Sequence, residues 1–298
     1  MRLLLAFDDE LALAQQLAAE LGCPLHTIQR HTFPDGEMRL VLPKPLPEHV
    51  VLLRGLQQPN DKLVELMIAA PTARELGAKR LLLVTPYLAY MRQDMEFTPG
   101  EAVSQRHIAR LLSQHFDALI TVDPHLHRIA SLDEVMPAGQ GRALSAAPLL
   151  GRWIAQQRPG ALLIGPDEES AQWVAEAAAA AGLAHAVGRK LRQGDHQVQL
   201  ALPEVEVAGR PVVLLDDMAS TGRTLVGAAE QLLVRGAASI DVAVTHALFN
   251  GDALLALRAA GVGAIWSANT VPHASNAVSI APLLARAVDE ALQPGQAG

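Results

Sequence analysis

Residues 212–224, with the sequence VVLLDDMASTGRT, could bind a phosphorylated sugar. Asp216 and Asp217 follow an apolar run and can accept hydrogen bonds from sugar hydroxyls, directly or through Mg²⁺. The short residues after them can direct backbone amides and hydroxyls to a phosphate at a helix N-terminus; they are Ser220, Thr221, Gly222 and Thr224. Because an N-capped helix needs only one such residue, the pattern favours a pentose phosphate ligand.

Short apolar runs that alternate with helix-like segments would position these residues. The runs RLLLAF, VVLLRG, RLLLVT, ALITVD, ALLIGP, PVVLLDD and IDVAVTH have the length of strands, and residues 63–76 and 225–235 have helical periodicity. Their continuous apolar character predicts parallel strands that are covered by helices on both faces. We therefore predict an α/β fold that binds its ligand beyond the carboxyl ends of the strands.

The two halves of the chain resemble each other at an offset of about 160 residues. LLLAFDDE matches LLIGPDEE, IQRHTFPDGEMRLVLP matches VGRKLRQGDHQVQLALP, and RELGAKRLLLVTPYL matches LVRGAASIDVAVTHAL. These ordered matches favour a duplicated domain, 1–145 and 146–298, although any two α/β units share apolar strands and Gly-Ala turns. The loop after VVLLRG reads LQQPND instead of DDMASTGRT, so only the second copy has the special loop. Asp8, the counterpart of Asp167, is therefore expected to be structural.

Composition and charge narrow the classes of partner. The 298 residues carry a net charge of −7, which favours neither nucleic acid nor an anionic membrane as a partner. The N-terminal apolar run is too short for the core of a signal peptide, and no run of 18 apolar residues occurs. Cys23 is the only cysteine, so an intrachain disulfide cannot form and a reducing compartment fits. We expect a cytoplasmic protein.

Motifs in both halves resemble those of one family, the ribose-phosphate pyrophosphokinases or PRPP synthetases. Residues 212–224 resemble the 5-phosphoribosyl 1-diphosphate (PRPP) motif that this family shares with type I phosphoribosyltransferases. FPDGEMRL, PYLAYMRQDMEFTPGEAVS, VDPHLH, GPDEESAQWVAEAAA, GRKLR, VTHALFNGDA and ANTVP continue the match in the family's order. The resemblance covers roughly residues 1–285. It implies two tandem type I phosphoribosyltransferase-like domains, each with a mainly parallel sheet flanked by helices.

By this resemblance the chain is a ribose-phosphate diphosphokinase, which transfers the diphosphate of ATP to the 1-hydroxyl of ribose 5-phosphate and gives PRPP and AMP. The residues implied to bind ribose 5-phosphate are Arg192, Asp216, Asp217, Ser220, Thr221, Gly222, Arg223 and Thr224. Lys190 and Arg192 would stabilise the transferring diphosphate as catalytic residues; without the resemblance, GRKLRQGDH reads as a solvated loop. The implied cofactor is Mg²⁺, associated with His125 and Asp167.

ATP must be held without a P-loop, because no GxxxxGK[ST] motif is present. The resemblance implies these ATP-binding residues: Phe33, Asp35, Gly36, Glu37, Arg92, Gln93 and His125. Phe33 can stack on adenine, and in the family its segment comes from a neighbouring subunit, which implies a homodimer or a higher homo-oligomer. On its own FPDGE reads as an ordinary turn, and DPHLH is weak evidence for a metal site.

A few positions depart from the family pattern. Ser220 stands where many members have Asp, and Arg223 where Gly or Ala is commoner, but a serine can still donate to a phosphate. The segment near Met95 and Glu96 is less basic than usual, so activation by inorganic phosphate is not carried over. Two alternatives are a phosphoribosyltransferase, which would not depend on ATP, and a silent regulatory subunit, which predicts a degraded PRPP motif or lost loop basics. Neither loss is seen.

Overall fold

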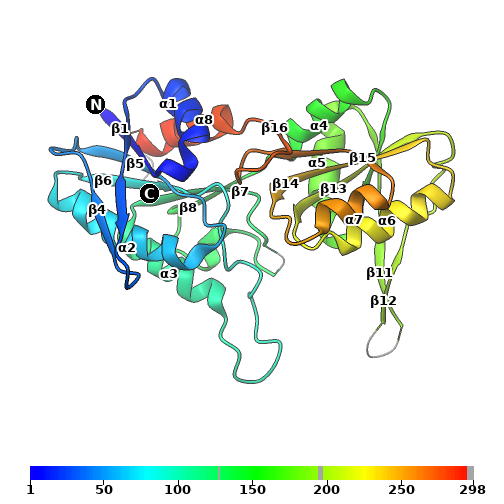
Figure 1. Ribbon diagram of the computed structural model, residues 1–298, viewed down its shortest axis with the longest axis horizontal. Helices are drawn as coiled ribbons and strands as arrows, with labels where there is room; N and C mark the ends of the chain where they lie inside the picture. Colours follow the sequence, from blue (N-terminus) through cyan, green and yellow to red (C-terminus); the bar gives the residue numbers. More distant parts are fainter. Residues whose placement is uncertain (127, 194–196, 294–298) are drawn as a thin grey trace. The chain divides into compact units, whose positions relative to one another are not determined.

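The chain folds into two α/β units in the computed structural model, which describes residues 1–126, 128–193 and 197–293 (Figure 1). For residues 190–193 and 197–200 only the backbone is described. The first unit consists of Met1–Leu144 together with the last helix, α8 (Ala281–Leu292), and the second of Ser145–Ile280. Within the described residues each unit has a six-stranded parallel sheet and a two-stranded hairpin, so the predicted fold class is confirmed.

The first unit has the strand order β2-β1-β5-β6-β7-β8. Its strands are β1 (Arg2–Ala6), β2 (Leu25–Thr27), β5 (His49–Leu53), β6 (Arg80–Val84), β7 (Ala118–Val122) and β8 (Gly141–Leu144), and its hairpin is β3 (Gln29–Thr32) with β4 (Met38–Val41). The helices α1 (Leu11–Leu21) and α8 pack together, as do α2 (Pro59–Glu75) and α3 (Ser104–His115). These pairs cover opposite faces of the sheet, which explains why its strands are apolar on both sides (Figure 1).

The second unit repeats this arrangement with the strand order β10-β9-β13-β14-β15-β16. Its strands are β9 (Leu162–Gly165), β10 (Ala184–Val187), β13 (Pro211–Ala219), β14 (Ser239–Ala247), β15 (Val262–Ala268) and β16 (Asn276–Val278), and its hairpin is β11 (Arg189–Gln193) with β12 (Gln197–Ala201). Here α4 (Ala147–Gln157) packs with α5 (Ala171–Ala181), and α6 (Arg223–Val234) with α7 (Ala253–Ala259). Strand for strand, β1 corresponds to β9 and β5 to β13.

The single-turn helices η1 (Asp8–Glu10) and η3 (Glu168–Ser170) follow the corresponding strands β1 and β9, and η2 (Leu132–Glu134) precedes β8. The longest described helix, α2, has 17 residues, whereas a bilayer requires about 20 apolar residues. None of the helices in the described part of the chain is long and apolar enough to span a membrane.

The last helix differs from the domain division expected from the sequence. That division assigns residues 281–298 to the second domain, but α8 packs on α1 of the first unit. The helix buries Leu284 and Val288, and the apolar surface that covers them is provided by the first unit. In the same way α4 follows β8 of the first sheet but packs on α5 of the second unit. A helix lies where its apolar face is buried, and linear order does not reveal that place.

Candidate functional site

The carboxyl end of β13 brings two acids to the edge of the second sheet. Residues 212–215 are fully buried, Asp216 is half-buried, and Asp217 is only 2% exposed. Asp216 Oδ1 accepts a hydrogen bond from the backbone N–H of Asp217 at 3.0 Å. Asp167, which is also buried, follows the neighbouring strand β9, and its Oδ1 accepts from the backbone N–H of Glu169 at 3.1 Å. Neighbouring strands thus bring three of the predicted site carboxylates to one edge.

The electrostatics of this edge suit a cationic or hydroxyl-rich ligand. Burial and the neighbouring carboxylates of Asp217 and Asp167 raise the pKa of Asp216 well above its ordinary value. Within the described residues, no three His, Cys, Asp or Glu side chains lie close enough to enclose a metal ion. Mg²⁺ typically takes one or two carboxylates from a protein and completes its shell with water and substrate phosphates, so these oxygen donors fit that ion.

The turn after β13 presents an open helix N-terminus. Gly222 has φ 70°, a left-handed conformation that suits glycine, and α6 begins at the next residue. The N-cap residue Gly222 has no side chain that could cap the first turn of α6, so the leading amides of the helix can donate to an anion. Asn250 supports the turn from the chain segment after β14: its backbone N–H donates to Ser220 O at 3.0 Å and its Nδ2 to Ser220 Oγ at 3.1 Å. The exposed side chains of the turn belong to Thr221, Arg223 and Thr224.

The predicted adenine-side residues lie on the turn of the β3–β4 hairpin. The backbone N–H of Phe33 donates to Glu37 O at 2.7 Å, that of Gly36 donates to Phe33 O at 2.9 Å, and Asp35 Oδ1 accepts from the N–H of Glu37 at 3.1 Å. The Phe33 ring is 40% exposed and meets the His31 ring edge-on at a centroid distance of 4.8 Å. The segment is therefore a tight turn that presents an aromatic ring outside the core.

Arg92, Gln93 and His125 lie on loops that follow the neighbouring strands β6 and β7. Gln93 Nε2 donates to Glu101 Oε2 at 3.2 Å. An ion pair that the sequence analysis missed connects the two loops: Arg128 Nη1 lies 2.6 Å from Oδ1 of Asp94, whose side chain is 1% exposed. This pair holds the segment of Arg92 and Gln93 beside the segment that contains His125.

Lys190 and Arg192 lie on β11, opposite Leu200 and Val198 of β12. Their side chains lie outside the described part of the structure. The hairpin occupies the same place after β10 as β3–β4 does after β2 in the first unit. The catalytic role of these two basic residues therefore stays a prediction from the family resemblance.

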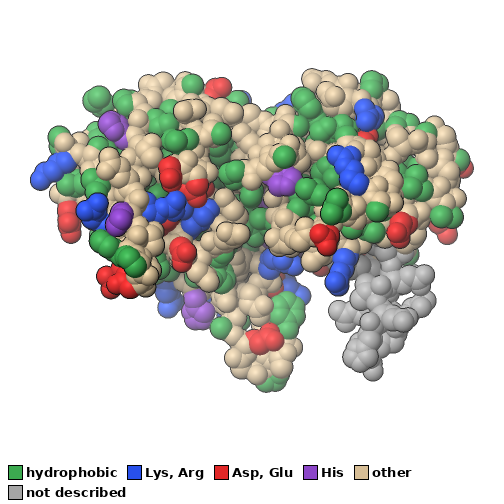
Figure 2. Space-filling view, viewed as in Figure 1, with side chains coloured by type: hydrophobic (Ala, Val, Ile, Leu, Met, Phe, Trp, Pro, Cys, Tyr) green, Lys and Arg blue, Asp and Glu red, His purple; other side chains and the backbone are tan. Residues whose placement is uncertain are grey.

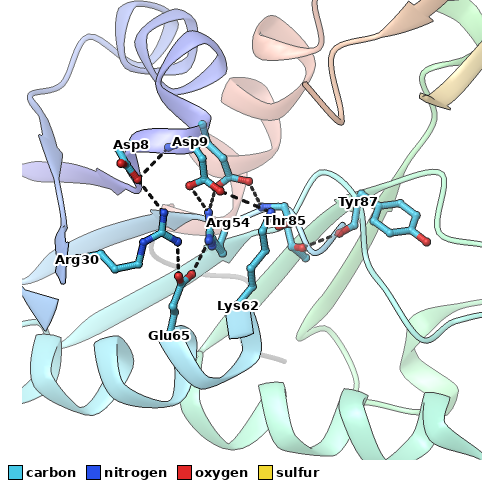
Figure 3. Close-up of polar contacts among 10 residues, drawn as sticks. Asp8, Asp9, Arg30, Arg54, Lys62, Glu65, Thr85 and Tyr87 are labelled. Carbon is cyan, nitrogen blue, oxygen red and sulfur yellow. Dashed lines mark hydrogen bonds and ion pairs between the residues drawn. The ribbon is translucent and has the colours of Figure 1, made fainter. Parts of the chain in front are cut away.

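The corresponding strand end of the first unit carries an arginine instead of an acid (Figure 3). Arg54 follows β5 and is fully buried, with Nη1 2.6 Å from Asp9 Oδ1 and Nη2 2.5 Å from Glu65 Oε2. Asp8 Oδ1 accepts from Arg30 Nη2 at 3.1 Å. This network is not predicted from the sequence motifs, although a charged residue directly after the apolar run VVLL is a signal that points to it.

Comparisons with known proteins agree across the whole chain. Residues 3–115 match the N-terminal domain of ribose phosphate pyrophosphokinase, and residues 200–290 match the phosphoribosyl synthetase-associated domain. The chain is 39% identical to a ribose-phosphate pyrophosphokinase of Methanopyrus kandleri, over 96% of this chain and 98% of that one. It is 31% identical to one of Halobacterium salinarum, over 96% and 100%. The crystal structure of phosphoribosylpyrophosphate synthetase from Mycobacterium smegmatis matches with a TM-score of 0.85 at 25% identity, over 99% of both chains.

Proposed function

Because this chain belongs to the ribose-phosphate pyrophosphokinase (PRPP synthetase) family, we propose that it transfers the diphosphate of ATP to the 1-hydroxyl of ribose 5-phosphate and produces PRPP and AMP. The family predicted from the motifs, and with it the prediction of an enzyme, is confirmed by these relatives. The observation that carries ribose 5-phosphate as the acceptor is the end of β13, where an acid pair precedes a helix N-terminus. The match to ribose-phosphate pyrophosphokinases over nearly the whole chain favours ATP as the donor.

Ribose 5-phosphate binds at this end of β13 in our proposal. The amides and hydroxyls of residues 220–224 hold the 5-phosphate, helped by the positive end of the α6 dipole. Asp216 and Asp217 accept hydrogen bonds from the ring hydroxyls. The raised pKa of Asp216 supports this role, since hydroxyl donors or a cation would relieve the repulsion among the three carboxylates.

The transfer step needs positive charge around the diphosphate. The 1-hydroxyl oxygen of ribose 5-phosphate forms a bond to the β-phosphorus of ATP, and the bond from that phosphorus to the α,β-bridging oxygen breaks. AMP leaves with that oxygen, and the hydroxyl loses its proton. Lys190 and Arg192 stabilise the charge of the transferring group, Lys as a point charge and Arg as a fork.

The proposed cofactor is Mg²⁺, with Asp167 and His125 as its protein contacts. Bound there, it would neutralise charge on the phosphates of ATP. Asp167 suits it because its carboxylate is buried close to Asp216, and carboxylate oxygens are ligands that Mg²⁺ takes from proteins.

We propose that ATP contacts Phe33 on the β3–β4 hairpin of a neighbouring subunit. Exposed apolar side chains on the hairpin and on α2 support association of this kind, because apolar surface favours burial between subunits. They are Phe33, Val41, Val64, Met67 and Ile68. We therefore propose a homodimer or a higher homo-oligomer as the active form.

The test is incubation of the purified protein with ATP, Mg²⁺ and ribose 5-phosphate, with AMP and PRPP followed by chromatography. We expect the two products in equal amounts and no product without ATP. A parallel reaction with inorganic phosphate measures activation by phosphate, a property that is not carried over from the family because the segment near Met95 and Glu96 is less basic than usual.

Two results would replace the proposal. PRPP consumption with a free nucleobase, independent of ATP, would indicate a phosphoribosyltransferase. Binding of ribose 5-phosphate without any AMP or PRPP would indicate a silent regulatory subunit, and would direct attention to Ser220 and Arg223, which depart from the family pattern.

A further inference from the structure

A network of charged side chains is buried at the end of β5 in the first unit (Figure 3). Arg54 is its centre: the guanidinium is fully buried, packs over the Phe7 ring at 4.4 Å from the centroid, and contacts Asp9 and Glu65. Glu10 Oε2 lies 3.4 Å from Arg54 Nη1. The other members are Arg30, Lys62 and Asp8, and acidic and basic side chains emerge side by side between α1 and α2 in Figure 2.

The network reaches the β3–β4 hairpin through one bridging acid. Glu65, on α2, is 1% exposed; its Oε2 contacts Arg54 and its Oε1 lies 2.5 Å from Arg30 Nη1. Arg30 lies on β3, and its second amino group contacts Asp8. Phe33 follows three residues later at the turn. The base of the hairpin is therefore attached to α2 and to the end of β1, while its turn is exposed.

The same network reaches the loop that carries Arg92 and Gln93. The backbone of Gly55 is held from both sides: its N–H donates to Glu10 Oε1 at 2.5 Å, and its carbonyl accepts from Lys62 Nζ at 3.0 Å. The next N–H, of Leu56, donates to Tyr87 O at 2.9 Å, and Thr85 Oγ1 donates to the same carbonyl at 3.0 Å. This carbonyl stands at the start of the loop after β6. One buried centre thus holds two of the segments that are proposed to contact ATP, the β3–β4 hairpin and the loop after β6.

Stability alone does not account for this arrangement. Removing charged groups from water is unfavourable, and a well-packed apolar cluster of the same volume often stabilises a fold as well or better. Charge-assisted contacts differ from apolar packing because they are directional and set the position of the groups that they join. Arg54 occupies the place that the acid pair occupies in the second unit, and its charge is compensated by ion pairs with Asp9 and Glu65 of the same unit.

We propose that Arg54, Glu65 and Arg30 are positioning residues for ATP: they fix the base of the β3–β4 hairpin and the neighbouring loop, so that Phe33 and Arg92 are held in place before ATP binds. This role rests on the proposed function, since it concerns the nucleotide side of that reaction. None of the three residues needs to touch ATP. The proposal separates them from the ribose 5-phosphate site, which lies in the second unit.

The test uses the full-length protein with Arg30→Gln, because the side chain of Arg30 is 28% exposed and its replacement does not leave a cavity in the core. We expect KM for ATP to rise about tenfold, as loss of one charge-assisted contact would give, while KM for ribose 5-phosphate changes less than about twofold. Hydrogen–deuterium exchange should become faster in peptides that cover residues 29–41. Arg30→Lys, which keeps the charge, should restore part of the ATP affinity.

Arg142→Gln is the matched control, because Arg142 is 26% exposed and pairs with Glu290 at 3.0 Å elsewhere in the same unit. It should leave both KM values and the exchange of residues 29–41 unchanged. Equal changes in both KM values for Arg30→Gln, or unchanged exchange in the hairpin, would overturn the positioning role. If the wild-type protein makes no PRPP, the proposed function fails, and the exchange measurement alone then decides whether Arg30 holds the hairpin.

Discussion

The ends of β5 and β13 occupy the same place in two sheets with the same strand order, but the charged side chains at the two ends have different surroundings. At β13, burial and the nearby carboxylates of Asp217 and Asp167 raise the pKa of Asp216, which favours its uncharged form. At β5, Arg54 Nη1 lies 2.6 Å from Asp9 Oδ1 and Nη2 lies 2.5 Å from Glu65 Oε2, so the charge of Arg54 is compensated by ion pairs within the fold. The difference shows that two sheets with the same strand order can place an acid pair at a strand end in one unit and a buried arginine with acidic partners at the matching end in the other.

The hairpins extend the comparison. β3–β4 carries Phe33 at its turn and is held at its base by Arg30, whereas β11–β12 carries Lys190 and Arg192 on its first strand. We interpret the first as a positioned contact for the nucleotide and the second as the source of catalytic charge. Substitutions in the β3–β4 hairpin should therefore change KM for ATP, whereas substitutions of the basic residues on β11 should change kcat.

Lys190→Ala should give the largest effect, a fall in kcat on the order of 10³-fold, because a charge that stabilises the transferring diphosphate is lost. The dissociation constant of ribose 5-phosphate should change less than about threefold. Rates of AMP release and calorimetric titration measure the two quantities. Arg189→Ala removes the same charge from the adjacent position on β11 and is the control. Equal losses of turnover and binding would contradict a role confined to the transition state.

Glu65→Gln should lower the free energy of unfolding by about 4 kcal/mol, because it breaks a buried ion pair and leaves Arg54 with incomplete compensation. Urea denaturation measures this quantity. Glu290→Gln removes an acid from an exposed pair with Arg142 and should cost less than about 1 kcal/mol. If the two variants unfold at the same urea concentration, the first unit does not depend on internal charge compensation.

The pH dependence of stability tests the same network through Glu10. Burial raises the pKa of Glu10 from 4.5 to about 7. Because the folded-state pKa is the higher one, protonated Glu10 stabilises the fold below pH 4.5, and this contribution is lost as the pH rises through 7. Relative to Glu10→Gln, the wild type should therefore lose roughly 3 kcal/mol of unfolding free energy over this interval. Denaturation of both proteins across this pH range is the measurement, and parallel profiles would refute the assignment.

Asp216→Asn should have the smallest effect on stability and the opposite sign. Removing one of three mutually repelling carboxylates should raise the free energy of unfolding of the ligand-free protein by about 1 kcal/mol, while ribose 5-phosphate binds at least about tenfold more weakly. Thermal unfolding and titration calorimetry measure the two effects. Asp252→Asn, at an exposed acid of the same unit, should change neither. A destabilised Asp216→Asn variant would mean that the acid pair is structural, as the charges at β5 are.

Much of the fold follows from local patterns. Continuous apolar runs predict buried parallel strands, and the sequence repeat predicts two similar units, which the matching strand orders bear out. The acids and the turn at the end of β13 are contiguous in the chain, so their proximity could be inferred without a structure. The network around Arg54 could not, because Glu65 and Arg30 reach it from α2 and β3, and their meeting depends on how these elements pack.

The amino-acid order alone was sufficient for the family, the α/β class and the turn after β13, because each depends on residues that are neighbours in the chain or recur at a fixed period. Folding in three dimensions decided that α8 completes the first unit, that Arg54 is buried among acids, and that Asp216 has a raised pKa. These properties arise from burial and from contacts between segments distant in sequence. Desolvation and charge proximity act only after packing has brought the groups together.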